Sequence, residues 1–177
     1  MKRVVVGCLV ILAGMTAFGA EPPLAVGTRL PRLTGSDLAG QEVRLPEMAT
    51  GRVAVLMFGF SYGSRTAVEA WGHHVQATWG NDARVAWYQL PMVGGLGRLA
   101  KPFITGGMRK ETPAQYHGNS VVVFGGTGAW KARLAVTDDR AAYIVILDRD
   151  GVVRWILPGS RDDSRLADLD AQVRALL

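Results

Sequence analysis

The segment from Arg52 to Leu90 changes its hydrophobic period twice, which constrains the fold more than any other feature of the chain. The run Arg52 to Phe58 is apolar after its first residue, as in a strand buried on both faces of a sheet. Apolar residues then recur at positions 68, 71, 75 and 79, the spacing of one helix face. A second run, Val85 to Leu90, is stopped by Pro91. This order predicts a βαβ unit with parallel strands.

The last third of the chain predicts a hairpin followed by a helix. Ala141 to Leu147 is an apolar strand, and Asp148 to Gly151 forms a turn in which Gly151 supplies a positive φ. Val152 to Leu157 returns antiparallel and stops at Pro158. Leucine and valine then recur at helical spacing up to the end of the chain. The order βαβ, insertion, ββα predicts an α/β fold with a mixed central sheet and helices on both faces.

Two stretches show weaker patterns. Residues 21–46 predict an extended lead-in with one short strand at 43–45. Residues 93–136 predict an insertion whose helix, at 99–109, is interrupted by Pro102 and frayed at its paired glycines. A strand at 121–124 and a short helical turn at 130–136 complete the insertion.

The first twenty residues predict a secretory signal peptide. A basic start precedes an almost uninterrupted apolar run from Val4 to Phe18, and small residues follow near Ala20. The run is shorter than the roughly 20 residues that span a bilayer, so a retained anchor is the weaker alternative. We therefore expect a domain over 21–177 that is periplasmic or secreted, and membrane-tethered where the signal is not cleaved. The sequence predicts no nucleic-acid role, because the net charge of +5 at pH 7 falls to +3 without the signal.

The single cysteine, Cys8, lies inside this predicted signal. Lipidation of Cys8 is an alternative, although most of the apolar stretch would then follow the cysteine. After cleavage near Ala20 the protein would hold no thiol, and therefore no disulfide and no thiolate nucleophile.

The residues between 53 and 155 resemble the thioredoxin superfamily, especially its secreted thiol-disulfide reductases and redoxins. The resemblance rests on the strand Val53 to Phe58, the following F-G-F-S-Y-G-S-R-T loop, and the later I-V-I-L-D-R-D-G-V-V-R-W hairpin. It implies a thioredoxin-like fold, in which this loop carries an aromatic residue and a CxxC pair. Tyr62 matches the aromatic residue, while Gly63 and Thr66 stand where the two cysteines would be.

Two parts of the redox apparatus of this superfamily are therefore missing from the sequence. Gly63 offers no nucleophile, and Thr66 replaces the second thiol. The family also places a cis-proline before the later strand, and here Ala141 and Ala142 occupy that region. A narrower resemblance, over about Arg52 to Trp155, is to the mitochondrial ATPase complex assembly factor family numbered ten and its bacterial relatives. That resemblance implies a chaperone for the membrane sector of ATP synthase rather than a redox enzyme.

No metal or cofactor is predicted. His73 and His74 are adjacent, so on a helix they cannot bind one metal from the same face. Neither glycine cluster, at 94–97 or 125–128, has the spacing of a phosphate-binding loop. Arg65 lies at a predicted helix N-terminus, where a small anion is an alternative ligand.

The leading functional hypothesis is an exported, redox-inactive protein that binds another protein, which in the assembly hypothesis is membrane-embedded. The candidate binding residues are those of the cysteine-free loop and the later alanine pair, namely Ser61, Tyr62, Gly63, Ser64, Arg65, Thr66, Ala141 and Ala142. Two alternatives stay open. One is an enzyme, a divergent reductase or peroxiredoxin relative that uses a partner's thiol, and the other is a small-anion binder.

Overall fold

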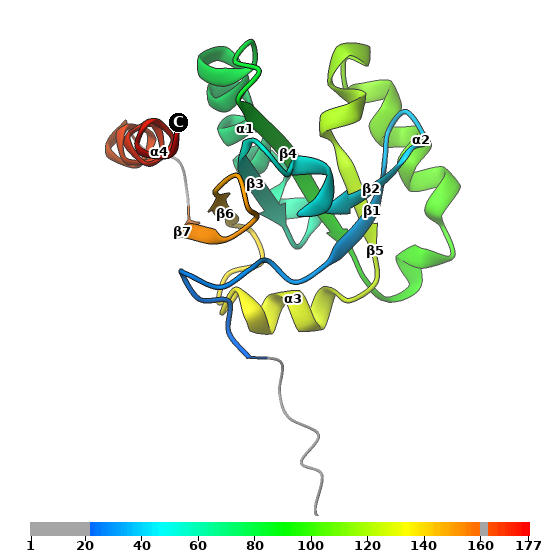
Figure 1. The fold of residues 1–177 in the computed structure, drawn as a ribbon. Helices are drawn as coiled ribbons and strands as arrows, with labels where there is room; N and C mark the ends of the chain where they lie inside the picture. Colours follow the sequence, from blue (N-terminus) through cyan, green and yellow to red (C-terminus); the bar gives the residue numbers. More distant parts are fainter. Residues whose placement is uncertain (1–21, 160–162) are drawn as a thin grey trace, which may run out of the picture.

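The computed structural model describes residues 22–159 and 163–177, and this part of the chain forms a seven-stranded sheet flanked by helices (Figure 1). The strands lie in the order β2-β1-β5-β4-β3-β6-β7. The strands are β1 (Leu33–Asp37), β2 (Glu42–Leu45), β3 (Val53–Gly59), β4 (Val85–Val93), β5 (Val121–Phe124), β6 (Ala142–Leu147) and β7 (Val153–Gly159). The helices are α1 (Arg65–Trp79), α2 (Lys101–Glu111), α3 (Thr127–Arg133) and α4 (Asp163–Leu176). Short 3-10 helices are η1 (Glu47–Ala49), η2 (Tyr62–Ser64), η3 (Gly95–Arg98) and η4 (Ala114–Asn119).

Strand β3 lies near the middle of the sheet and matches the predicted buried strand. It pairs in parallel with β4, from Val53 opposite Val85 to Gly59 opposite Pro91. On its other side it pairs antiparallel with β6. The side chains of residues 53–58 are 0% exposed, because both faces of the strand are covered. The predicted α/β class with a mixed sheet is confirmed.

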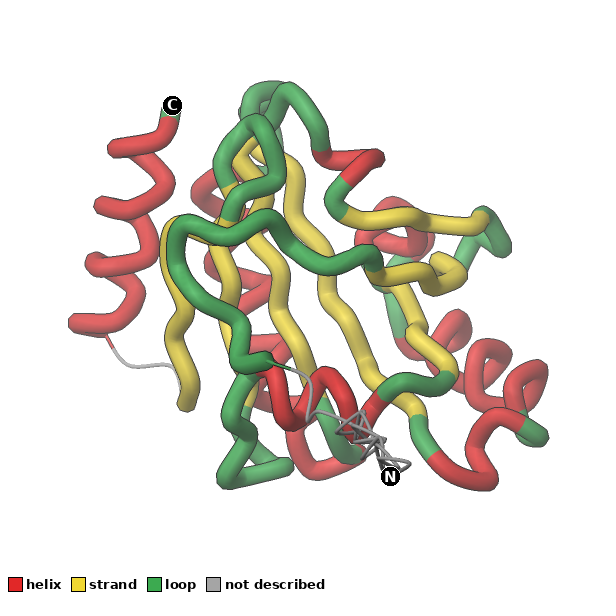
Figure 2. Tube along the Cα trace, turned by 60° about the horizontal axis from the view of Figure 1, so that its bottom comes forward, coloured by secondary structure: helices red, strands yellow, loops and turns green. Residues whose placement is uncertain are grey.

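Each face of the sheet has its own cover, as predicted. On one face the helical stripe of α1 packs with leucine and valine side chains of α4, and Trp71 is fully buried there. On the other face α3 contributes Trp130, whose ring stacks on Phe58 at 5.3 Å. In Figures 1 and 2 the C-terminal helix α4 lies beyond β7 at one end of the sheet, and Figure 1 shows α2 at the other end.

Polar contacts join α1 to α4. Nε1 of Trp79 donates a hydrogen bond to Oδ1 of Asp170 at 2.9 Å. Nε2 of His74 lies 3.1 Å from the same oxygen. His74 therefore has a structural contact at this helix interface, while the neighbouring His73 is exposed.

Two prolines lie inside elements that the sequence predicts them to break. Pro91 is the last residue of β4 that pairs with β3, and it falls between the bridge at Gln89 and the β5 pairing that begins at Met92. Its missing N–H group thus lies in a gap of the ladder. Pro102 lies in the first turn of α2, where N–H groups have no helical partner. The predicted strand end and helix interruption were therefore wrong.

The sequence predicts only an extended lead-in before the strand at 43–45, but residues Leu33–Asp37 form β1. This strand pairs antiparallel with β2 and with β5. Its inward positions include Gly35 and Asp37, so the apolar alternation that marks a strand is absent. A Cβ atom at Gly35 would lie 2.6 Å from Cγ1 of Val121, so glycine allows β1 to approach β5. The predicted signal peptide lies outside the described residues.

Candidate functional site

The cysteine-free loop follows β3 and is closed by a reciprocal serine pair. Oγ of Ser64 donates to the backbone oxygen of Ser61 at 2.7 Å, and the N–H of Ser61 donates back to Oγ of Ser64. The Ser61 side chain also accepts from the Ser64 N–H, which completes a capping box at the start of the turn that leads into α1. A Cβ atom at Gly59 would lie 2.7 Å from Oγ of Ser64, so the tight turn depends on glycine there.

The fold brings the predicted alanine pair to this loop. Ala142 pairs with Gly59 across the β3–β6 ladder. Oγ of Ser61 donates to the backbone oxygen of Asp139 at 2.7 Å, which ties the loop to the segment before β6. Both alanines are nevertheless buried, Ala142 completely. The two alanines therefore pack beneath the loop in the protein interior and form no part of its exposed surface.

The loop residues differ in how far they are exposed to solvent. Tyr62 is 87% exposed, and Gly63 and Thr66 are also exposed. Ser64 is 1% exposed and is used in the cap. A ligand can therefore reach Tyr62, Gly63 and Thr66 directly.

Arg65 carries two ion pairs. Its Nε lies 2.7 Å from Oε1 of Glu69 on the same helix, and its Nη1 pairs with Oε2 of Glu111 at the end of α2. The hydrogen bond to Glu69, opposed by desolvation and supported by Glu111, raises the pKa of the guanidinium further above its ordinary value. The cation on which the small-anion alternative depends is thus already paired with two carboxylates.

A cavity of about 570 Å³ opens beside the loop. Its size is typical of ligand pockets, and much of its lining is apolar. The loop contributes Tyr62 to this lining, and α2 contributes Phe103, which is 85% exposed. The main apolar lining residues are Phe60, Val68, Met92, Phe103, Ile104 and Met108.

Helix α2 forms one wall of this cavity but contributes no buried residue. The ion pair between Glu111 and Arg65 links its last turn to α1. Nε of Arg109 donates to the backbone oxygen of Leu38 at 2.6 Å, and Nζ of Lys101 lies 5.3 Å from the centre of the Phe124 ring. The contacts that hold this wall therefore include an ion pair, a hydrogen bond and a cation–π contact.

The chain is similar to known proteins in structure rather than in sequence. No protein-family model matches the chain, and no curated protein matches it. A putative thiol:disulfide interchange protein DsbE from Chlorobium tepidum superposes with a TM-score of 0.60 at 21% identity, covering 86% of this chain and 98% of its own. The pneumococcal exposed lipoprotein thioredoxin from Streptococcus pneumoniae gives 0.58 at 16% identity, covering 81% and 99%. BsSco, of the Sco family of cytochrome c oxidase assembly proteins, gives 0.56 at 11% identity, covering 85% and 97%.

The fold is thioredoxin-like. The predicted fold is thereby confirmed. At such low sequence identities, the similarity to these structures concerns the fold alone. No cysteine lies in the part of the chain that the structure describes, since Cys8 is the single cysteine of the sequence. Within residues 22–159 and 163–177 no group of three or more candidate side chains could hold a metal ion. No described helix combines the length and apolarity needed to cross a membrane.

The sequence analysis did not predict that α2 lies at the site of this thioredoxin-like domain. Phe103, Gly107 and Glu111 recur at a spacing of four and all line the cavity. Ile104 and Met108 repeat the same spacing beside them. The stripe is visible in the sequence, but the expected break at Pro102 and fraying at the paired glycines concealed it.

Proposed function

We propose that this chain is a redox-inactive, thioredoxin-like protein that binds another protein through its cysteine-free loop and the cavity beside it, and that it is not an enzyme. One observation carries the proposal. Tyr62 is 87% exposed at the edge of an apolar cavity, while Gly63 and Thr66 occupy the positions that the thioredoxin resemblance gives to the cysteines. A thiolate is the nucleophile of disulfide exchange, and this loop has none.

The exposed aromatic residues favour a protein ligand. Large apolar side chains that stay exposed around a pocket are typical of interaction sites, and tyrosine is enriched among residues that anchor interfaces. Tyr62 of the loop and Phe103 of α2 both line the cavity and are both more than four-fifths exposed. A partner segment that inserts an apolar side chain would cover both rings.

We infer further that the protein is exported and acts in the assembly of a membrane complex, of which ATP synthase is the candidate. Export is supported by the apolar run after the basic N-terminus, and the assembly role by the family resemblance of residues 52–155. Two of the similar structures are in keeping with this proposal. One is an exposed lipoprotein, and the other belongs to a family of cytochrome c oxidase assembly proteins.

Site-specific photocrosslinking in the native cell envelope tests the proposal. A photoreactive phenylalanine derivative replaces Tyr62 in one variant and Met48 in the matched control, because Met48 is 48% exposed in η1, before β3 rather than after it. We expect light-dependent attachment of a defined polypeptide at position 62 and none at position 48. The proposal fails when position 62 captures nothing or when both positions capture the same proteins.

A further inference from the structure

Strand β4 has an open edge at its beginning. β3 covers one side of β4 from Val85 to Pro91, whereas β5 pairs on the other side only at Met92 and Val93, after one bridge at Gln89. No described strand lies beside residues 85–88 on that side. These four residues are between 4% and 8% exposed, in contrast to 0% for residues 53–58 of β3. All four residues nevertheless line a cavity at this edge.

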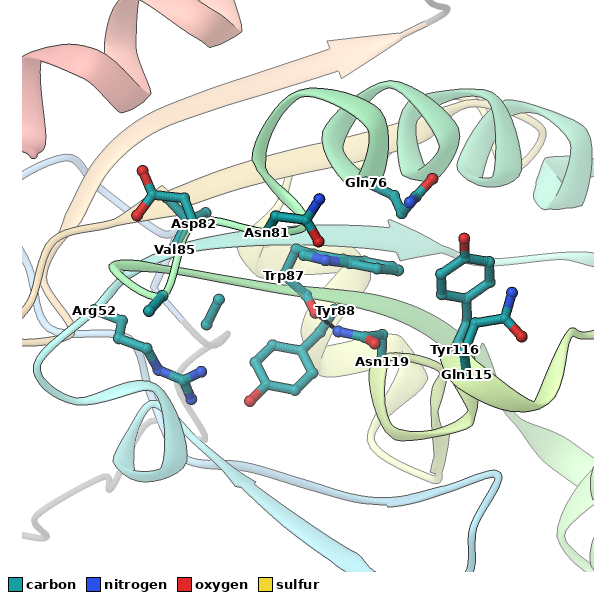
Figure 3. Close-up of a pocket in the computed structure, with 13 residues that line it drawn as sticks. Arg52, Gln76, Asn81, Asp82, Val85, Trp87, Tyr88, Gln115, Tyr116 and Asn119 are labelled. Carbon is teal, nitrogen blue, oxygen red and sulfur yellow. Dashed lines mark hydrogen bonds between the residues drawn. The ribbon is translucent and has the colours of Figure 1, made fainter.

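A cavity of about 500 Å³ runs along this edge, and its lining is largely polar (Figure 3). The 3-10 helix η4 supplies another part of the lining, with Gln115, Tyr116 and Asn119. Nδ2 of Asn119 donates to the backbone oxygen of Trp87 at 2.9 Å. A side-chain N–H therefore occupies the place that the backbone N–H of a neighbouring strand would take. An added strand would therefore displace the Asn119 side chain from the Trp87 oxygen.

Arg52 supplies a cation at the end of the cavity where β4 begins. It precedes Val53, which pairs with Val85, and its guanidinium extends along the cavity towards Tyr88 (Figure 3). Nη2 of Arg52 donates to the backbone oxygen of Met48, and among the described residues Arg52 forms no ion pair with a carboxylate. Asp82, the acidic residue of the same lining, is held by two hydrogen bonds from the side chain of Arg84, which lower its pKa to about 2.

We propose that this edge binds the C-terminal end of an extended polypeptide, which adds as a strand antiparallel to residues 85–88 and places its carboxylate on Arg52. The direction follows from the geometry, because the last residue of a strand antiparallel to β4 lies beside Val85, and the Arg52 side chain lines the same cavity as Val85. Four residues of β4 allow about 13 Å of strand pairing. Strand addition supplies the main-chain hydrogen bonds, and a guanidinium recognises a carboxylate through paired hydrogen bonds. This site is separate from the loop at the carboxyl end of β3.

Peptide titrations followed by NMR test the site on the intact protein. The probe is an N-acetylated pentapeptide of alternating valine and threonine with a free C-terminal carboxylate. It is compared with the same peptide ending in an amide and with one whose alternate backbone nitrogens are methylated. We expect shifts at the Trp87 backbone amide and the Asn119 side-chain amide, and roughly tenfold weaker binding for the amide peptide. Methylation removes the strand hydrogen bonds and should abolish binding.

The variant Arg52→Gln should remove the difference between the acid and amide peptides. Arg44→Gln is the matched control, because Arg44 is an exposed arginine paired with Glu42 in β2, and it should keep the difference. Equal affinity for the acid and amide peptides in the wild-type protein would overturn the role of Arg52. Acetate that binds as tightly as the peptide, or a methylated peptide that binds unchanged, would overturn strand addition.

Discussion

Helices α1 and α2 both border the cavity at the cysteine-free loop, but they are attached to the protein in different ways. α1 buries five residues against the sheet, including Trp71 and Trp79. α2 buries none, and its contacts include the ion pair of Glu111 with Arg65. Apolar burial stabilises a fold strongly, whereas exposed ion pairs contribute little. One wall of the cavity therefore belongs to the core, and we expect the other to open locally at a lower cost in free energy.

Replacing one aromatic residue in each wall should give the largest contrast. Trp71→Ala removes a fully buried ring and should lower the free energy of unfolding by about 3–5 kcal/mol. Phe103→Ala removes a ring that is 85% exposed and should change it by less than about 0.5 kcal/mol. Urea denaturation followed by circular dichroism measures both. Similar losses in the two variants would show that α2 is part of the core.

The contact between α1 and α4 should give the next largest effect. Asp170→Ala removes the acceptor of the Trp79 N–H group and leaves that buried donor without its partner, at a cost of about 1–3 kcal/mol in the free energy of unfolding. Asp170→Asn keeps an oxygen at this position and serves as the control, with a smaller loss. Thermal and urea denaturation of both variants test the order. A loss as large in the asparagine variant would assign the effect to charge instead.

The stabilisation from the hydrogen bonds of Asp148, in the turn between β6 and β7, should depend on pH. Burial tends to raise the pKa of Asp148, but hydrogen bonds from the Val152 N–H, Arg154 and the Asp150 N–H outweigh it and lower the pKa. A lowered pKa in the folded state means that ionised Asp148 stabilises the protein above the unfolded value of about 3.9. This stabilisation is lost as the pH falls through the folded value.

Asp148→Asn should therefore lower the free energy of unfolding by about 1 kcal/mol at pH 7, and the difference from the wild type should shrink below about pH 4. Denaturation at a series of pH values between 2 and 7 measures this, with both proteins followed side by side. A difference that stays constant across the series would contradict the hydrogen-bonded carboxylate as its source.

The smallest effect on global stability is expected at the tether of α2. Glu111→Gln removes the ion pair with Arg65. The side chains of Arg65 and Glu111 are 40% and 55% exposed, so the free energy of unfolding should change by less than about 0.5 kcal/mol. Amide hydrogen exchange in α2 should nevertheless accelerate, since this contact links its last turn to α1. The control is Glu42→Gln, which removes an exposed pair in β2 and should leave α2 unaffected. Unchanged exchange in Glu111→Gln would argue that the other contacts alone hold α2.

The same contrast explains what could be predicted from the sequence. α1 and the strands around it bury apolar side chains at regular spacing, so positions 68, 71, 75 and 79 were correctly assigned to one helix face. The turn at Gly151 was also predicted, because its φ of +78° is a conformation that glycine adopts readily. In these regions the local pattern and the tertiary contacts agree.

The rest could not be predicted because tertiary contacts replace the local pattern. β1 carries Gly35 and Asp37 at inward positions and is identified only by its partners β2 and β5. α2 is joined to the site by Glu111, which pairs with Arg65 far away in the sequence. The loop residues were placed by resemblance, but the second wall of the cavity has no local signal of its position.

A disulfide-reduction assay tests most directly whether this thioredoxin-like scaffold lacks redox chemistry. The protein carries Cys8→Ser, so that no thiol remains, and reduction of insulin by dithiothreitol is followed by turbidity, with an active thioredoxin as the positive control. We expect insulin to precipitate no faster than with dithiothreitol alone, because neither Gly63 nor Thr66 can form a mixed disulfide. Precipitation faster than this background would contradict the proposal that the protein is redox-inactive.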